Sequence, residues 1–386
     1  MDVRAIVVLG APGESNETIG GTPYALCPVL GRAVALHVLD RLKSAGISGF
    51  TVLTEAPPST WPAVGKDNQS GTWLQASGEQ VWRIAEQAFA DYVQAGADTI
   101  LFLRVGAYAE LDFADFLQYH FDRGSRMSGA IDRNGIPLDI YAISRRNEAA
   151  YLFRHQLRQF RTACEFYPFS GYANRLVSPH DLRDLAIEAL MQRVQIRPEG
   201  EQIKPGVWVG RGAQVHRRAR VLSPAFIGAG CRVRAAAVVT RCSALEHHTV
   251  VDCGTVVENV STLPYTYLGA GLDVTHSVVG RGRVWNLKRD VEVEFADSRL
   301  IGEASANAPL RALGSLLSLA SFFPAQMLRG LFAPSHRECP PSLPEAINRP
   351  AAVRDVPATT LKASAPAVDA GEFPANMVIA RRYGNE

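Results

Sequence analysis

Residues 203–263 read IKPGVWVGRGAQVHRRARVLSPAFIGAGCRVRAAAVVTRCSALEHHTVVDCGTVVENVSTL. An aliphatic residue occurs at every sixth position, and a small or β-branched residue follows it by four. The aliphatic series is Ile203, Val209, Val215, Val221, Ile227, Val233, Val239, Leu245, Val251, Val257 and Leu263. The small series is Val207, Ala213, Ala219, Ala225, Cys231, Ala237, Ser243, Thr249, Thr255 and Ser261. Neither an α-helix nor a single strand has a period of six, so the segment predicts short strands joined by corners.

Three such six-residue units complete one coil of a parallel β-helix. The aliphatic position is expected to point inward, where stacked coils bury a continuous column, and the small position fits near a corner. The open strand edges at the two ends of such a stack need cover. We expect the N-terminal half of the chain to cover one end and residues 265–302 to cover the other.

The repeat resembles the hexapeptide-repeat family, whose coils form a left-handed parallel β-helix. That resemblance, and not the period, implies the left hand. Some members are acyltransferases that use a histidine base. The histidines available here are His216, His247, His248 and His276, and none lies in a motif. Oligomerisation, or positioning of another domain, is therefore the favoured role, with acyl transfer as an alternative.

The first part of the chain alternates short apolar runs with amphipathic helices. Strands are predicted at 5–9, 50–53 and 99–103, and helices at about 33–45 and 78–95. This alternation is typical of an α/β domain with a mostly parallel sheet. Ligands of such sheets bind at the carboxyl ends of the strands.

Three segments carry a further resemblance. They are VVLGAPGESNETIGGTPYALCPVLGRAVALHVLDRLKSAGI, LFLRVGAYAELDFADFLQYHFDRG and FYPFSGYANRLVSPHDLRDLAIEAL. In this order they resemble the sugar-phosphate nucleotidyltransferases, such as mannose-1-phosphate guanylyltransferase and other NDP-sugar pyrophosphorylases. The resemblance covers about residues 3–300. It implies a Rossmann-like nucleotidyltransferase domain over 1–197 and a left-handed β-helix over 203–301.

The family transfers a nucleotidyl group from a nucleoside triphosphate to a sugar 1-phosphate, with magnesium held by two aspartates. Several family positions are substituted in this chain. Tyr24 stands in place of a lysine. The segment around Gly106 lacks the first of the two metal-binding aspartates, and Arg175 replaces the second aspartate. The glycine-rich loop is short and contains Pro12, which has no N–H to donate. We expect no catalytic residue, no metal site and no cofactor, with magnesium required only if the enzyme is active.

A nucleotide or phosphate site is still a candidate. Its residues, by resemblance, are Gly10, Ala11, Gly13, Ser77, Gly78 and Arg175. Arg175 has a favoured alternative, a structural ion pair. An active enzyme would need relocated metal ligands, for which Asp112 and Asp115 are the nearby carboxylates. Helix capping is the favoured role for those two.

The C-terminal part contains a segment without charge between Arg311 and Arg329. Residues 308–333 are predicted to form an amphipathic helix, packed on protein or lying at a membrane surface, with a membrane span as the least favoured alternative. Residues 334–386 are rich in Pro and Ala and are predicted to be a largely disordered tail. The net charge of +2 gives no reason to expect nucleic acid.

Together these patterns predict a degenerate nucleotidyltransferase homologue with a regulatory or scaffold role in nucleotide-sugar or surface-polysaccharide biosynthesis. Expected partners are copies of itself or an active homologue, with a nucleotide or nucleotide-sugar as a possible ligand. The expected location is cytoplasmic, with residues 308–333 as a possible peripheral contact to the inner face of the membrane. The alternatives are an active pyrophosphorylase and a hexapeptide-type acyltransferase.

Overall fold

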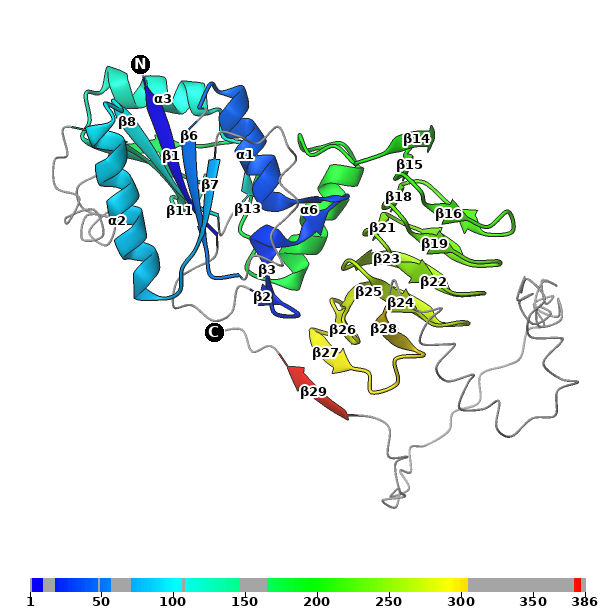
Figure 1. Cartoon of the computed structure of the whole chain (residues 1–386). Helices are drawn as coiled ribbons and strands as arrows, with labels where there is room; N and C mark the ends of the chain where they lie inside the picture. The colour runs from blue at the N-terminus through cyan, green and yellow to red at the C-terminus, as the bar shows by residue number, and fades with distance from the viewer. Residues whose placement is uncertain are drawn as a thin grey trace, which may run out of the picture.

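The chain forms an α/β part followed by a strand-rich part (Figure 1). The computed structural model describes residues 2–9, 18–47, 49–56, 71–105, 108–145 and 165–304, and the backbone of 378–382. In the described residues, no helix has the length and apolar character needed to cross a membrane. The predicted helix at 308–333 lies outside them.

A seven-stranded, mostly parallel sheet forms the centre of the α/β part. Its strand order is β12-β10-β11-β8-β1-β6-β7, and β8, β1, β6 and β7 run parallel. Strand β11 is antiparallel to β8 and to β10. The strands are β1 (Val3–Leu9), β6 (Gly49–Thr54), β7 (Gly71–Gln75), β8 (Thr99–Val105), β10 (Met127–Ile131), β11 (Pro137–Ser144) and β12 (Glu165–Pro168).

Helices cover both faces of this sheet because β1 is apolar on both sides. Val7 packs in one core cluster with Leu39 of α1, and Ile6 packs in another with Phe89 of α2. The predicted strands and both predicted helices are therefore confirmed. The helices are α1 (Val34–Ser44), α2 (Glu79–Gln94), α3 (Phe113–Asp122) and α6 (Pro179–Leu190). Short elements are β2 (Thr18–Ile19), β3 (Thr22–Pro23), η1 (Tyr24–Leu26), β4 (Pro28–Val29), β5 (Arg32–Ala33), β9 (Tyr108–Ala109) and β13 (Ala173–Asn174).

Residues 201–303 form the strand stack, in which short parallel strands lie one below another (Figure 1). In the first layers each strand residue pairs with the one 18 positions further along, as Val207 pairs with Ala225 and Ala225 with Ser243. Three ladders result, and one strand from each makes a layer. The strands are β14 (Glu201–Lys204), β15 (Val207–Val209), β16 (Gln214–Val215), β17 (Arg220–Val221), β18 (Ala225–Ile227), β19 (Arg232–Val233), β20 (Val238–Thr240), β21 (Ser243–Leu245), β22 (Val250–Val251), β23 (Val256–Thr262), β24 (Thr266–Leu268), β25 (Asp273–Gly280), β26 (Arg283–Asn286), β27 (Val291–Glu294) and β28 (Ile301–Glu303).

The interior of the stack is the predicted aliphatic column. Its fully buried members are Ile227, Val233, Val239, Leu245, Val251 and Val257. Each such side chain contributes roughly 1.5–3 kcal/mol relative to an exposed one. The prediction is wrong for Ile203, which is 56% exposed, and incomplete for Val215, which is 38% exposed. Both lie where the stack begins, and the described part of the chain has no layer beyond them.

The repeat changes length once, at a corner. Thr240 pairs with Glu258, 18 residues on, but Ala244 pairs with Ser261, only 17 on. The predicted inward position of Leu263 is therefore wrong. Thr262 takes that ladder position, and Leu263 packs in the cluster that contains the α/β part.

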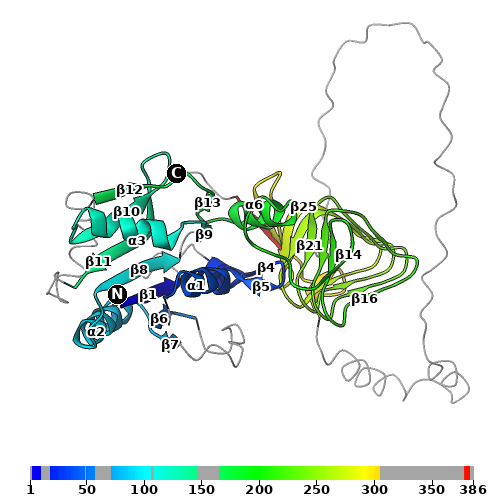
Figure 2. The same cartoon turned by 90° about the horizontal axis from the view of Figure 1, so that it is seen from above.

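The two ends of the stack differ. Strands β26, β27 and β28 add antiparallel pairs at the last layers, as expected for residues 265–302. The α/β part does not cover the first layer, contrary to expectation. It lies beside the stack, with α6, β4 and β5 between the two parts (Figure 2). Strand β29 (Val378–Arg382) pairs with β27, so this piece of the predicted disordered tail is a strand.

Candidate functional site

The carboxyl edge of the parallel sheet is where the sequence places a nucleotide. Of the predicted residues, Gly10, Ala11, Gly13 and Gly106 lie outside the described part of the chain. Gly78 is the N-cap of α2 with φ of +51°, and its N–H donates to Oε1 of Glu55 at 2.7 Å. The Gly78 amide, which the resemblance assigns to a nucleotide site, is thus bound by a carboxylate of the protein. Ser77, the neighbouring candidate, is exposed.

Tyr24, which stands where the family has a lysine, is part of the core. It is 4% exposed, lies in η1, and belongs to the cluster that contains α1 and the strand stack. A buried phenol provides no cation for a phosphate. The predicted loss of a phosphate-binding charge is consistent with this placement.

Arg175 forms an ion pair, the favoured alternative in the sequence. Its Nη2 lies 3.5 Å from Oδ2 of Asp132, with 48% of the Arg175 side chain exposed. Oδ1 of Asp132 also accepts from the backbone N–H groups of Asn134 and Ile136, both at 2.8 Å. A half-exposed pair of this kind contributes about 0–1 kcal/mol. Arg175 and Asp132 thus neutralise each other at this edge.

The two aspartates considered as relocated metal ligands are also engaged. Oδ1 of Asp112 caps α3 by accepting from the N–H of Ala114 at 2.9 Å and of Asp115 at 3.3 Å. The capping role is confirmed for Asp112. Asp115 accepts a hydrogen bond from the Tyr167 hydroxyl. Burial, together with Asp115, raises the pKa of Tyr167 to about 12, so the phenol remains a donor.

The remaining carboxylates near this edge have partners as well. Asp139 accepts from the Tyr141 hydroxyl at 2.9 Å, and its Oδ2 lies 3.8 Å from Nη1 of Arg104. Glu110 accepts from the Tyr108 hydroxyl at 3.1 Å and from the N–H of Gln195. Among the residues the structure describes, His, Cys, Asp and Glu side chains nowhere gather in threes or more to hold a metal ion.

The second polar site is the junction between the α/β part and the strand stack. Glu246, at the end of β21, is 3% exposed. Its two carboxylate oxygens accept from consecutive backbone N–H groups, Oε1 from Leu30 at 2.8 Å and Oε2 from Gly31 at 2.9 Å. These amides form the turn between β4 and β5. Burial raises the pKa of Glu246 from 4.5 to about 8, although the two amides oppose the shift.

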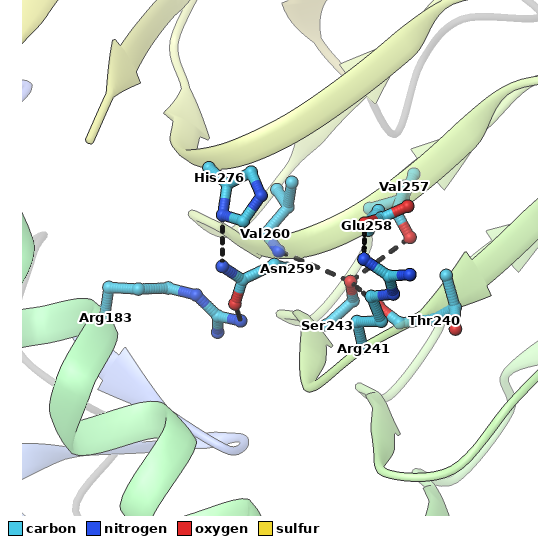
Figure 3. Close-up of polar contacts among 9 residues, drawn as sticks. All are labelled: Arg183, Thr240, Arg241, Ser243, Val257, Glu258, Asn259, Val260 and His276. Atoms are coloured by element: carbon cyan, nitrogen blue, oxygen red, sulfur yellow. Dashed lines mark hydrogen bonds and ion pairs between the residues drawn. The ribbon is translucent and has the colours of Figure 1, made fainter. Parts of the chain in front are cut away.

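Arg183 of α6 makes a second buried polar contact across the junction (Figure 3). It is 1% exposed, and its guanidinium donates to Ser261 Oγ at 3.0 Å and to Cys242 O and Asn259 Oδ1 at 2.7 Å. Asn259 in turn bonds His276 Nδ1 at 2.7 Å. All three acceptors of Arg183 are neutral. Burial lowers the pKa of Arg183 to about 10, so the side chain is still a cation at neutral pH.

Sequence reasoning missed both junction residues. A signal existed for Glu246, because Gly210 and Gly228 hold the equivalent places in the two preceding layers and the repeat then breaks. Arg183 had no such signal, since an arginine on an amphipathic helix is usually solvated. The buried charge becomes visible only when α6 is placed against the corners at Cys242 and Asn259.

Neither models of protein families nor curated protein sequences match this chain. Support for a function therefore comes from the residues and contacts described above.

Proposed function

We propose that this chain is a non-catalytic relative of the sugar-phosphate nucleotidyltransferases that acts as a scaffold or regulatory protein in nucleotide-sugar or surface-polysaccharide biosynthesis. The observation that carries the proposal is the engagement of the carboxylates at the sheet edge. Asp112, Asp115, Asp132 and Asp139 each bond to the protein itself. Glu110 does the same.

Nucleotidyl transfer requires cations and amides around a triphosphate, and usually a magnesium ion on two carboxylates. The described groups do not fit that ion, because the resemblance places Arg175 at one ligand position and Asp132 holds it there. The Gly78 amide is bound by Glu55. Magnesium therefore has no part in the proposed role and belongs to the active alternative only.

The architecture supports a scaffold. We infer a Rossmann-like domain followed by a parallel β-helix, supported by the sheet order and by the 18-residue pairing of the stack. The left hand of the coil rests on the resemblance alone. The junction through Glu246 and Arg183 fixes one part on the other. Such a body presents fixed surfaces to copies of itself or to an active homologue in the cytoplasm. A nucleotide or nucleotide-sugar is a possible ligand at the strand ends, and 308–333 a possible contact to the inner membrane face.

The test is release of pyrophosphate by the purified chain. The panel combines nucleoside triphosphates with sugar 1-phosphates in the presence of magnesium, and a known active pyrophosphorylase is run in parallel. We expect no release above the protein-free background for any pair. Turnover that disappears with EDTA would refute the non-catalytic role. The variant Asp132→Asn frees Arg175 without adding a metal ligand. Its pyrophosphate release should equal that of the wild type for every pair in the panel.

A further inference from the structure

After Glu201 at the start of β14, the first layers of the strand stack carry one sign of charge. Residues 202–245 contain no Asp or Glu. Their basic residues are Lys204, Arg211, Arg217, Arg218, Arg220, Arg232, Arg234 and Arg241. Arg234 and Arg241 have acidic partners in later layers, Asp252 at 3.2 Å and Glu258 at 2.6 Å.

The other arginines of this run have no such partner. All of them are exposed, and none makes an ion pair with a residue in the described part of the chain. They are Arg211, Arg217, Arg218, Arg220 and Arg232. A cluster of unpaired like charges raises the local potential and favours an anionic partner. Solubility alone does not require them, because the net charge of the whole chain is only +2.

The same end of the stack has open strand edges. The N–H groups of Gln214 and His216 donate to the second layer at 2.8 Å. Backbone groups of alternate residues in a strand point to opposite neighbours. The N–H and C=O of Val215 therefore face away from the stack. The N–H groups of Arg220 and Leu222 likewise donate to the second layer, so the N–H and C=O of Val221 also face away from the stack.

Apolar side chains accompany these edges. Ile203 is 56% exposed, Leu222 45% and Val215 38%. On β16 and β17, backbone groups without a partner in the described part of the chain occur together with exposed aliphatic residues and flanking cations. The exposed Ile203 lies on β14, and we term β14, β16 and β17 the open end. An open edge of this composition is a template for a further strand.

We propose that the open end binds a partner protein through an acidic, strand-forming segment that adds to β16. The free amides and carbonyls select an extended polypeptide, since neither a lipid surface nor a nucleic acid continues a strand ladder. The arginines select the acidic sequence. A second copy of this chain fits poorly, because a two-fold contact between open ends would place Arg217 and Arg218 against themselves. This inference names a partner class for the proposed scaffold role but does not depend on the loss of catalysis.

The probe is a short fluorescein-labelled peptide in which Glu alternates with Val and Thr, with versions that carry Gln or Lys in place of Glu. Fluorescence anisotropy with the full chain measures binding. We expect the Glu peptide to bind, the Gln peptide to bind about tenfold more weakly, and the Lys peptide not to bind. Added salt should weaken the binding of the Glu peptide, since its contacts with the arginines are exposed to solvent.

Two variants separate charge from strand addition. Val215→Pro removes an outward N–H and leaves the hydrogen bonds of Gln214 and His216 in place, as proline does on strand edges. The triple change of Arg217, Arg218 and Arg220 to Glu reverses the charge. Both should reduce Glu-peptide affinity about tenfold or more.

The matched control reverses the charges of Lys288, Arg289 and Arg299 at the other end of the stack and should leave binding unchanged. Circular dichroism establishes that each variant is folded.

Three results would overturn the proposal. Undiminished binding to Val215→Pro would mean charge attraction without strand addition. A dimer in light scattering that Val215→Pro converts to a monomer would mean that a second copy occupies the open end. Peptide binding only after deletion of 308–333 would mean that the chain covers its own edge. Pyrophosphate release would refute the non-catalytic role and leave these outcomes unaffected, so the two proposals fail separately.

Discussion

At the scale of single residues, Glu246 is a carboxyl group that is buried without a cation among the described side chains that contact it. Its oxygens accept the amides of Leu30 and Gly31. Repulsion from Glu199 raises the pKa of Glu246 further. Because burial raises its pKa from 4.5 to about 8, the folded protein retains a proton that the unfolded chain loses. Its contribution to stability is therefore complete below pH 4.5 and is lost as pH rises through about 8.

Glu246→Gln should remove this pH dependence. The amide is neutral at every pH, so the slope of unfolding free energy against pH between 4.5 and 8 should be smaller than in the wild type. At low pH the variant should be less stable by about 1–3 kcal/mol, because one of the two backbone amides loses its acceptor. Urea unfolding at several pH values measures both effects. Asp273→Asn, at an exposed position of the stack, is the control and should keep the wild-type slope. An unchanged slope in Glu246→Gln would contradict the assignment.

At the scale of elements, the turn between β4 and β5 decides how closely the two parts approach. Gly31 has φ of +97°, and a Cβ there would lie 2.9 Å from Glu199 Cβ and 3.2 Å from Phe226 Cζ. Glycine is therefore required both by its backbone conformation and by the contact with β18. The turn presents its amides to Glu246 only because no side chain separates them from the stack.

Gly31→Ala should therefore lower the free energy of unfolding by more than the positive φ alone would cause. Gly46 is the matched control, since it has φ of +82° and a Cβ at that position would meet no atom within 4 Å. We expect Gly46→Ala to destabilise by about 1 kcal/mol and Gly31→Ala by roughly 1–3 kcal/mol more. Thermal and urea unfolding of the two variants give the difference. Equal costs would mean that the turn is free to move away from the stack.

At the scale of the whole molecule, the junction makes one core out of two parts. Phe226, Ala244, Leu263 and Trp285 of the stack belong to the same buried cluster as Leu30 of the α/β part. Contact runs along the side of the stack, from Phe226 in the second layer to the hydrogen bond between His180 and Asp290 near the last.

This shared core predicts a single unfolding transition. Calorimetry should give equal calorimetric and van't Hoff enthalpies, and far-ultraviolet circular dichroism should follow the same midpoint. Arg183→Ala removes a buried contact of the junction and should separate the transition into two. Arg193→Ala, which breaks an exposed pair with Glu188, is the control and should leave one transition. Two transitions in the wild type would show that the parts are independent.

The sequence predicted the elements better than their arrangement. A six-residue period is a local property, so the buried column from Ile227 to Val257 followed from it. The period cannot locate a missing residue at a corner, because Thr262 and Leu263 both suit a strand, and Leu263 was assigned to the wrong side. Side-on docking was also unpredictable, since every layer offers nearly the same face. At the candidate site, Arg175 and Asp112 took their favoured structural roles, while Glu246 and Arg183 depend on contacts between distant segments.

A repeated structure does not by itself determine the layer at which another domain docks. Neighbouring layers are about 4.8 Å apart and nearly identical, so a domain docked on their side has several almost degenerate positions. In the row that faces the β4–β5 turn, successive layers present Gly210, Gly228, Glu246, Leu263 and Gly280. Only one of these can accept the two amides of the turn. Glu246 therefore determines the layer at which the α/β part docks. Docking one layer higher or lower would leave the backbone N–H groups of Leu30 and Gly31 without the carboxylate that accepts them.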